Sequence, residues 1–282
     1  MSAEELQEPG ERKRCTAGER LFEEYLHSQG INDFEYEKEH AGKRKKPDYT
    51  ITLDREYLFD VKDFTYVDIG AGGFYDPYRR LRAKIGELRE QFREYKGWPC
   101  CGVLYNDNAP LVDLTTPMIV HGAMYGDPGI TMQLNTATGS VVKGSEKEEF
   151  LSGGKMLMRS MKKGTAEVRN STISALITLR KVRTGYARLS KDLRDWQQEH
   201  PDVEVCEWLG GSRDFDTEEE HLGVIVWENA FASLPLPRQL FCGRYDERHG
   251  LDNDSRLARL FAGDGVLEYE ALVGEEKSPL FS

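Results

Sequence analysis

The amino-acid sequence predicts an α/β (α+β) protein in which helices flank a mixed central sheet and a C-terminal extension follows. Two observations support this prediction. Residues 16–106 alternate between helical and strand periodicity, in the order helix, strand, strand, strand, helix, strand. Further along, apolar runs at 172–181 and 221–227 predict more buried strands, and residues 188–199 have the period of an amphipathic helix.

Local signals predict the bounds of the first elements. The first helix should begin after Thr16, because Glu19 follows at the spacing of a capping box, and it should end at Gly30. Residues 31–39 alternate and predict a strand. Residues 47–53 and 57–63 predict two further strands, joined as a hairpin by the tight connection at 54–56. A glycine-rich loop at 68–77, a long helix at 78–95 and a buried strand at 100–105 follow, and residues 106–150 are expected to be rich in loops.

The composition is typical of a globular protein in an aqueous, reducing compartment. Hydrophobic residues make up 39% and charged residues 31% of the 282 positions. No apolar run approaches the roughly 18–20 residues of a membrane span, and the first residues lack the apolar core of a secretory signal. The five cysteines are odd in number and irregularly spaced. We therefore expect a cytoplasmic protein with no membrane partner and no zinc site.

The charge of the chain is unevenly distributed. The net charge of −11 opposes binding of a polyanion. However, residues 155–195 carry eleven Lys or Arg and three Asp or Glu, whereas residues 199–282 carry nineteen Asp or Glu and seven Lys or Arg. The middle of the chain could face a phosphate backbone, or it could be solvated helix surface. The acidic C-terminal third favours contact with a protein partner.

Two acids and a lysine on the predicted hairpin suggest catalytic chemistry. Asp60 and Lys62 are two residues apart on a strand and point to one face, while Val61 points into the core. Asp48 lies on the paired strand and can reach the same patch. Mg²⁺ or Mn²⁺ takes oxygen ligands and can be held by one or two carboxylates. The lysine could then lower the pKa of a metal-bound water or stabilise charge on a scissile phosphate. The alternative is a plain surface ion pair between Asp60 and Lys62.

The hairpin resembles the motif of the PD-(D/E)XK, or restriction-endonuclease-like, nuclease superfamily. Pro47-Asp48 precedes Asp60-Val61-Lys62 by twelve residues, which is the usual spacing in that family. The resemblance covers residues 16–106 and implies a restriction-endonuclease-like nuclease core. Residues 107–282 are then an extension of the same domain or an accessory lobe for specificity or partner binding. The resemblance implies that Asp48, Asp60 and the Val61 carbonyl bind the metal and that Lys62 is catalytic.

Two further features resemble members of this superfamily. Gly18-Glu19 stands where some members carry a glutamate, which implies Glu19 as another metal ligand; Glu19 could instead only close the capping box, and Glu23 is then the reserve candidate. Gln91 and Tyr95 resemble the Gln-x-x-x-Tyr element of RecB-like nucleases, which implies contact with DNA or the metal shell.

The predicted helix that carries this element is also basic. Helical spacing would place Gln91 and Tyr95 on one of its faces. Arg79, Arg80 and Lys84 on the same helix could meet phosphates, and an ordinary helix surface is the alternative.

We therefore expect a Mg²⁺- or Mn²⁺-dependent endonuclease that hydrolyses DNA, in restriction, phage defence or repair, with RNA left open as a substrate. The alternative is a catalytically reduced module of the nuclease fold that binds nucleic acid or a protein partner. A homodimer is expected by resemblance, because many members cut both strands as dimers. An acidic nuclease repels DNA at long range, so a basic partner subunit is a further expectation.

Overall fold

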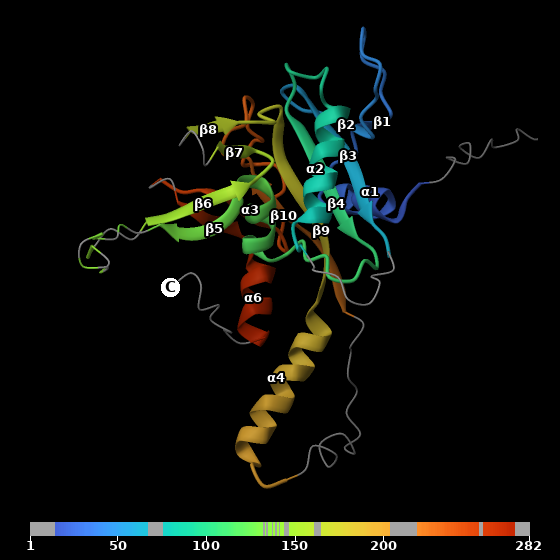
Figure 1. The fold of residues 1–282 in the computed structure, drawn as a ribbon. Helices are drawn as coiled ribbons and strands as arrows, with labels where there is room; N and C mark the ends of the chain where they lie inside the picture. The colour runs from blue at the N-terminus through green and yellow to red at the C-terminus, as the bar shows by residue number, and fades with distance from the viewer. Residues whose placement is uncertain are drawn as a thin grey trace, which may run out of the picture.

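A mixed sheet of eight strands forms the centre of the protein, in the order β1-β2-β3-β4-β9-β10-β11-β12 (Figure 1). The computed structural model describes residues 15–66, 76–131, 147–160, 165–203, 219–253 and 256–273, with a few single positions between 133 and 143. The strands of this sheet are β1 (Phe34–Tyr36), β2 (Tyr49–Thr52), β3 (Glu56–Phe64), β4 (Cys100–Asn106), β9 (Ile173–Arg183), β10 (Glu220–Glu228), β11 (Glu247–Leu251) and β12 (Leu257–Ala262).

Helices and two short hairpins complete the described fold. The helices are α1 (Ala17–Ser28), α2 (Arg79–Gln91), α3 (Pro117–Tyr125), α4 (Thr184–Glu199) and α6 (Asp264–Val273). The hairpins pair β5 (Gly126–Thr131) with β6 (Lys147–Gly153) and β7 (Leu157–Ser160) with β8 (Thr165–Val168). None of the described helices combines the length and apolarity needed to cross a membrane.

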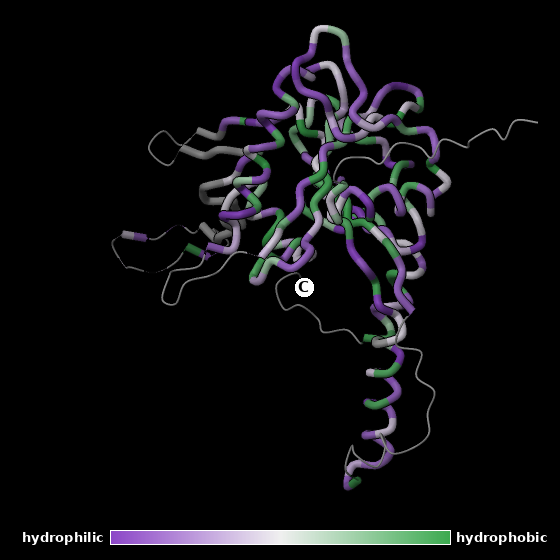
Figure 2. Tube along the Cα trace, turned by 90° about the vertical axis from the view of Figure 1, so that its right-hand side faces the viewer, coloured by the Kyte–Doolittle hydropathy of each residue, from purple (hydrophilic) through white to green (hydrophobic). Residues whose placement is uncertain are grey.

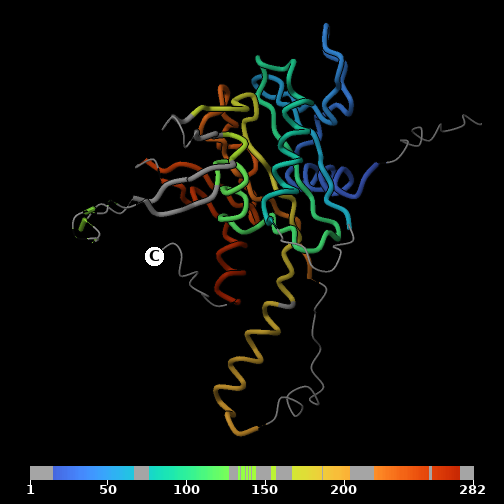
Figure 3. The backbone as a smooth tube through the Cα atoms, viewed as in Figure 1, coloured from blue at the N-terminus to red at the C-terminus, as the bar shows by residue number. Residues whose placement is uncertain are grey.

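Three neighbouring strands, β3, β4 and β9, run parallel at the centre of the sheet. Their carboxyl ends therefore meet at one edge. The β1-β2-β3 and β9-β10 pairs are antiparallel, β10 and β11 are parallel, and β12 closes the far side. Figure 3 shows that the chain beyond residue 106 completes the same sheet that the first hundred residues begin.

Both faces of the sheet are covered. On one face, α1 packs Phe22, Tyr25 and Leu26 against the side chains of Phe59 and Val103. On the other face, a second cluster joins α2 and α3 to Leu58, Leu104 and Trp227. Strands buried on both faces are expected to be apolar, as the first five residues of β4 are. By contrast, α4 projects from the body (Figure 2) and packs partly against α6.

Helix α1 forms as the sequence predicts. The Thr16 hydroxyl accepts a hydrogen bond from the Glu19 amide at 3.2 Å, and the Glu19 carboxylate accepts one from the Thr16 amide at 2.6 Å. This reciprocal pair is the predicted capping box. Gly30 has a φ of +72° just beyond the C-cap, where glycine adopts the left-handed conformation readily.

The predicted order of elements in residues 16–106 is confirmed, and some bounds are corrected. Strand β1 has three residues rather than nine, because Glu37 has a φ of +47° and leaves the extended conformation. Helix α2 ends at Gln91 rather than Tyr95. Helix α3 occupies part of the stretch expected to be loop-rich; it is apolar around most of its circumference, so it lacks an amphipathic period. Most of the predicted glycine-rich loop, residues 67–75, lies outside the described residues.

Candidate active site

Asp48 and Asp60 face each other across the β2–β3 hairpin. Tyr49 is paired with Phe59 in the register of these strands, so Asp48, just before β2, lies opposite Asp60. The Val61 amide donates a hydrogen bond to Asp48 Oδ2 at 2.6 Å, which continues the ladder through a side chain. The two carboxyl groups also influence each other's pKa, so they lie within electrostatic reach. The hairpin therefore brings together the two acids that the sequence predicts.

Lys62 completes this group. Its ammonium forms an ion pair with Asp60 Oδ2. The side chain of Asp60 is 3% exposed and that of Lys62 is 21% exposed. The ion pair is therefore largely removed from water, and the lysine is the partner that solvent can contact. This geometry differs from the alternative of a surface ion pair, because a buried pair carries a desolvation cost of several kcal/mol per ion.

Burial and neighbouring charges set the protonation of the acids. Burial, followed by the charge of Asp60, raises the pKa of Asp48 to about 7. Burial also raises the pKa of Asp60, although the ammonium of Lys62 opposes this shift. Burial acts to lower the pKa of Lys62, but the charges of Asp60 and Asp48 raise it above its ordinary value. The group therefore holds a proton on the acid pair near neutral pH and keeps the lysine charged.

Glu19 lies at the edge of this group, with its carboxylate engaged in other bonds. One carboxylate oxygen accepts from the Thr16 amide, and the other accepts from the Tyr36 hydroxyl at 3.4 Å. The charge of Glu19 contributes to the raised pKa of both Asp48 and Asp60, so the three acids are within electrostatic reach. Glu23, the reserve candidate, accepts from the Tyr49 hydroxyl at 2.9 Å.

The protein offers a divalent cation two carboxylates rather than three. Among the residues that the structure describes, no three Asp, Glu, His or Cys side chains gather closely enough to hold a metal. Asp48 and Asp60 nevertheless fit Mg²⁺ or Mn²⁺, because a cation would offset the burial and the neighbouring negative charge that raise both pKa values. Asp60 Oδ2 is buried and has no hydrogen-bond partner beside its ion pair with Lys62. The Val61 carbonyl lies on the same strand between Asp60 and Lys62.

Gln91 and Tyr95 hold the loop that leads into Asp48. Gln91 Nε2 donates to the Lys46 carbonyl, and the Tyr95 hydroxyl donates to the Lys45 carbonyl, each at 2.5 Å. Tyr95 is fully buried, so its ring is inaccessible to a ligand on the surface. It also lies beyond the end of α2, so the expected shared helical face does not form. Both side chains instead position backbone just before the first acid.

The same loop also stabilises the C-terminal end of α2. Lys43 Nζ donates to the Glu94 carbonyl at 2.5 Å, and Lys45 Nζ donates to the Glu90 carbonyl at 3.0 Å. Cations at the C-terminal end of a helix offset the partial negative charge of its unpaired carbonyls. Lysines of residues 43–46 therefore donate to carbonyls at the end of α2 and just beyond it, and Gln91 and Tyr95 donate back to carbonyls of this stretch.

The predicted basic residues of α2 differ in their surroundings. Arg79 is exposed. Arg80 donates to the Thr65 carbonyl at 2.7 Å, which places it over the end of β3. Lys84 pairs with Glu87 at 3.0 Å, and the charge of Glu87 helps to raise the pKa of Lys62. Glu87 is thus a neighbour of the site that no sequence pattern indicated.

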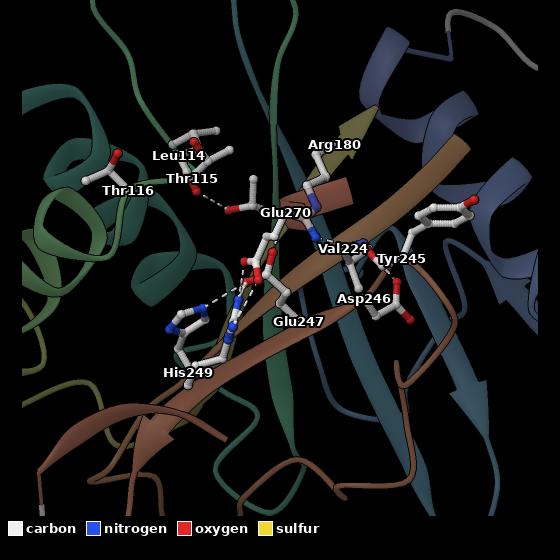
Figure 4. A network of polar contacts seen from close by, with 12 residues as sticks. Leu114, Thr115, Thr116, Arg180, Val224, Tyr245, Asp246, Glu247, His249 and Glu270 are labelled. Carbon is white, nitrogen blue, oxygen red and sulfur yellow. Dashed lines mark hydrogen bonds and ion pairs between the residues drawn. The ribbon is translucent and has the colours of Figure 1, made fainter. Parts of the chain in front are cut away.

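A second buried polar network lies on β9, β11 and β12 (Figure 4). Glu247 binds Arg180 at 2.5 Å and lies 3.4 Å from the His249 ring nitrogen and 3.6 Å from Arg259. Burial acts to raise the pKa of Glu247, but His249 and Arg180 lower it to about 2. Glu247 is therefore ionised throughout the neutral range and neutralises the arginines around it.

The fold and the site together define an α/β protein in which a central hairpin carries a buried carboxyl group, a half-buried one and a lysine. Comparison with protein-family models, with curated proteins and with solved structures finds no significant match for this chain.

Proposed function

We propose that this chain is a divalent-metal-dependent nuclease that hydrolyses phosphodiester bonds, centred on Asp48, Asp60 and Lys62. The observation that carries the proposal is the pairing, across the β2–β3 hairpin, of the half-buried Asp48 with the buried Asp60, which is itself ion-paired with Lys62. Such a group destabilises a fold unless a ligand uses it. By the resemblance of the hairpin motif, the substrate is DNA and the setting is restriction, phage defence or repair.

Each residue has a role that follows from its position. A bound Mg²⁺ or Mn²⁺ would supply Lewis-acid activation of water and of the phosphate. Asp48 and Asp60 would hold the ion, and the Val61 amide keeps the Asp48 carboxylate in place. The Lys62 ammonium, tethered by Asp60, can stabilise negative charge that develops on the phosphate. Because the pKa of Asp48 is about 7, the pair must lose a proton before it can bind metal, so activity should rise with pH.

Nicking of supercoiled plasmid in Mg²⁺ or Mn²⁺ tests this proposal. We expect wild-type cleavage that disappears with a chelator and in both Asp60→Ala and Lys62→Ala. Asp54→Ala is the matched control, because this exposed acid lies at the turn of the same hairpin. Far-UV circular dichroism checks that each variant folds. Cleavage that persists equally in the Asp60 and Lys62 variants would refute the assignment of the site.

A binding module without catalysis is the second candidate. It is favoured by the commitment of the Glu19 carboxylate to Thr16 and Tyr36, which leaves two acids for a metal. Isothermal titration with Mn²⁺ separates the two candidates when wild type does not cut plasmid. Binding that disappears in Asp60→Ala indicates a nuclease that awaits a partner or another substrate. An absence of binding indicates a module that uses the fold without the metal chemistry.

A further inference from the structure

A cavity opens at the edge of the sheet where the parallel strands end. It has a volume of about 400 Å³ and lies between the end of β4, the loop at 112–115 and the end of β9. Lys62 is paired with Leu104, and Leu104 with Thr178, so two strand spacings separate the lysine from the cavity wall. At ~4.8 Å per spacing, this distance is about 10 Å. A chain-like substrate held at Lys62 could therefore extend into the cavity.

Tyr66 has an exposed aromatic side chain, and its backbone is bonded to the segment that follows the cavity wall at the end of β4. Tyr66 follows β3 by two residues and is 63% exposed. Its amide donates to the Asn108 side chain at 2.6 Å, and the amide of Asp107, which lines the cavity, donates to the Phe64 carbonyl at 3.2 Å. These bonds fix the backbone of Tyr66 next to the cavity wall. Lys62 is four residues away, or about 13 Å along an extended strand.

Cations lie along this edge, one on α2 and two at the end of β9. Arg80 is bound to the Thr65 carbonyl on the α2 side. On the cavity side, Lys181 and Arg183 share one carboxylate, that of Glu220, at 2.6 and 3.1 Å. Glu220 is shared by these two cations, and the charge of Glu24 also acts on Lys181.

Acids also line the cavity, so the edge is mixed rather than uniformly positive. Asp113 Oδ1 accepts from the Thr115 amide and hydroxyl and from the Thr116 amide, which commits it to its own loop. Asp107 is the remaining carboxylate of the lining. This mixture of donors and acceptors suits the edge of a nucleobase better than a row of phosphates.

We propose that the substrate lies along this edge as a single strand, with one base stacked on Tyr66 and another in the cavity. The proposal rests on the proposed function for the identity of the ligand as a polynucleotide. Stacking on an aromatic ring requires an unpaired base, because bases inside a duplex already stack on each other. The chain's net charge of −11 also disfavours the dense phosphates of a duplex more than those of a single strand.

Fluorescence anisotropy on the full chain tests the proposal, in a Lys62→Ala background that prevents cleavage. The probes are a labelled oligothymidylate, the same sequence as RNA, and a duplex of equal length. We expect single strands to bind more tightly than the duplex. Tyr66→Ala should weaken single-strand binding about tenfold, which is within the range of one base–aromatic stack. Tyr66→Phe should bind like the parent, because the ring is kept.

Two control variants remove the same types of side chain, a tyrosine and an arginine, away from the proposed binding edge. Tyr269→Ala removes an aromatic side chain on α6, and Arg244→Ala removes an arginine that is paired with Glu268 and exposed much as Arg183 is. Neither should change binding. Arg183→Ala should weaken binding and reduce its salt dependence, since a lost phosphate contact lowers the slope.

The outcomes separate this proposal from the nuclease assignment. Single-strand binding that depends on Tyr66, without cleavage by wild type in any metal, supports binding of a single strand along this edge and counts against the nuclease assignment. Plasmid cleavage combined with equal or tighter duplex binding overturns the proposal that the substrate binds as a single strand, but it still supports the nuclease assignment. Equal binding by Tyr66→Ala and its parent, or no binding of any probe, also overturns it.

Discussion

Replacement of Asp48 by asparagine should stabilise the metal-free protein while removing its activity. The pKa of Asp48 rises from 3.8 to about 7 on folding, because the carboxyl is buried and faces Asp60. At 1.36 kcal/mol for each pKa unit, ionising this carboxyl in the folded protein costs about 4 kcal/mol. Asparagine has nearly the same shape, and its carbonyl can still accept from the Val61 amide.

The pH dependence gives the sign of this effect. A raised folded-state pKa means that stability is fully present below the unfolded pKa of 3.8 and is lost as the pH rises through about 7. The gain from Asp48→Asn should therefore be about 4 kcal/mol at pH 8 and less than half of that at pH 5. For a chain of this size, the gain at pH 8 corresponds to a rise in Tm of roughly 8–16 °C.

Thermal and urea unfolding in a chelator, at pH 5 and at pH 8, measure the effect. Asp33→Asn is the matched control, because this exposed acid lies just before β1 and is not buried. With Mn²⁺ added, wild type should gain stability and Asp48→Asn should not. The reasoning fails if Asp48→Asn is no more stable than wild type at pH 8, or if the gain is equal at both pH values.

Three more substitutions test other parts of the structure. Tyr95→Phe removes the hydroxyl bond to the Lys45 carbonyl and should cost about 1 kcal/mol in urea unfolding; it should also weaken Mn²⁺ binding by calorimetry, which Tyr57→Phe should leave unchanged. Glu247→Gln strands the buried charge of Arg180 and should cost about 3–5 kcal/mol at pH 7. Because the pKa of Glu247 is lowered to about 2, this difference should shrink as the pH falls below 4.5. Trp227→Phe removes a buried hydrogen bond of 3.0 Å and should cost about 1–3 kcal/mol, measured by chemical denaturation.

The sequence predicted the hairpin and its acids because their signals are local. Strand periodicity and a short connection fix the register of β2 and β3, and that register alone places Asp48 opposite Asp60. The Thr16–Glu19 cap is likewise a pattern within four residues. These predictions needed no knowledge of distant parts of the chain.

Features that depend on distant contacts were not predictable in this way. The bonds from Gln91 and Tyr95 to residues 45 and 46 join segments about fifty positions apart, so the helix pattern suggested a ligand-binding role for side chains that hold a loop. Helix α3 is apolar on most sides because it is buried between the sheet and a hairpin, and burial of this kind removes the amphipathic period. The cavity beside Tyr66 is formed by segments from three parts of the sequence.

The position of β9 has a consequence for synthesis of the chain. Strand β4 is apolar and buried over its first five residues, and its second neighbour in the sheet is β9, which is separated from it by 66 residues. At ribosomal rates of 5–20 residues per second, the open edge of β4 must wait about 3–13 s for its partner to be made. An apolar strand edge left open is a template for aggregation. Chaperone demand during translation should therefore peak in this interval, before the first residue of β9 emerges.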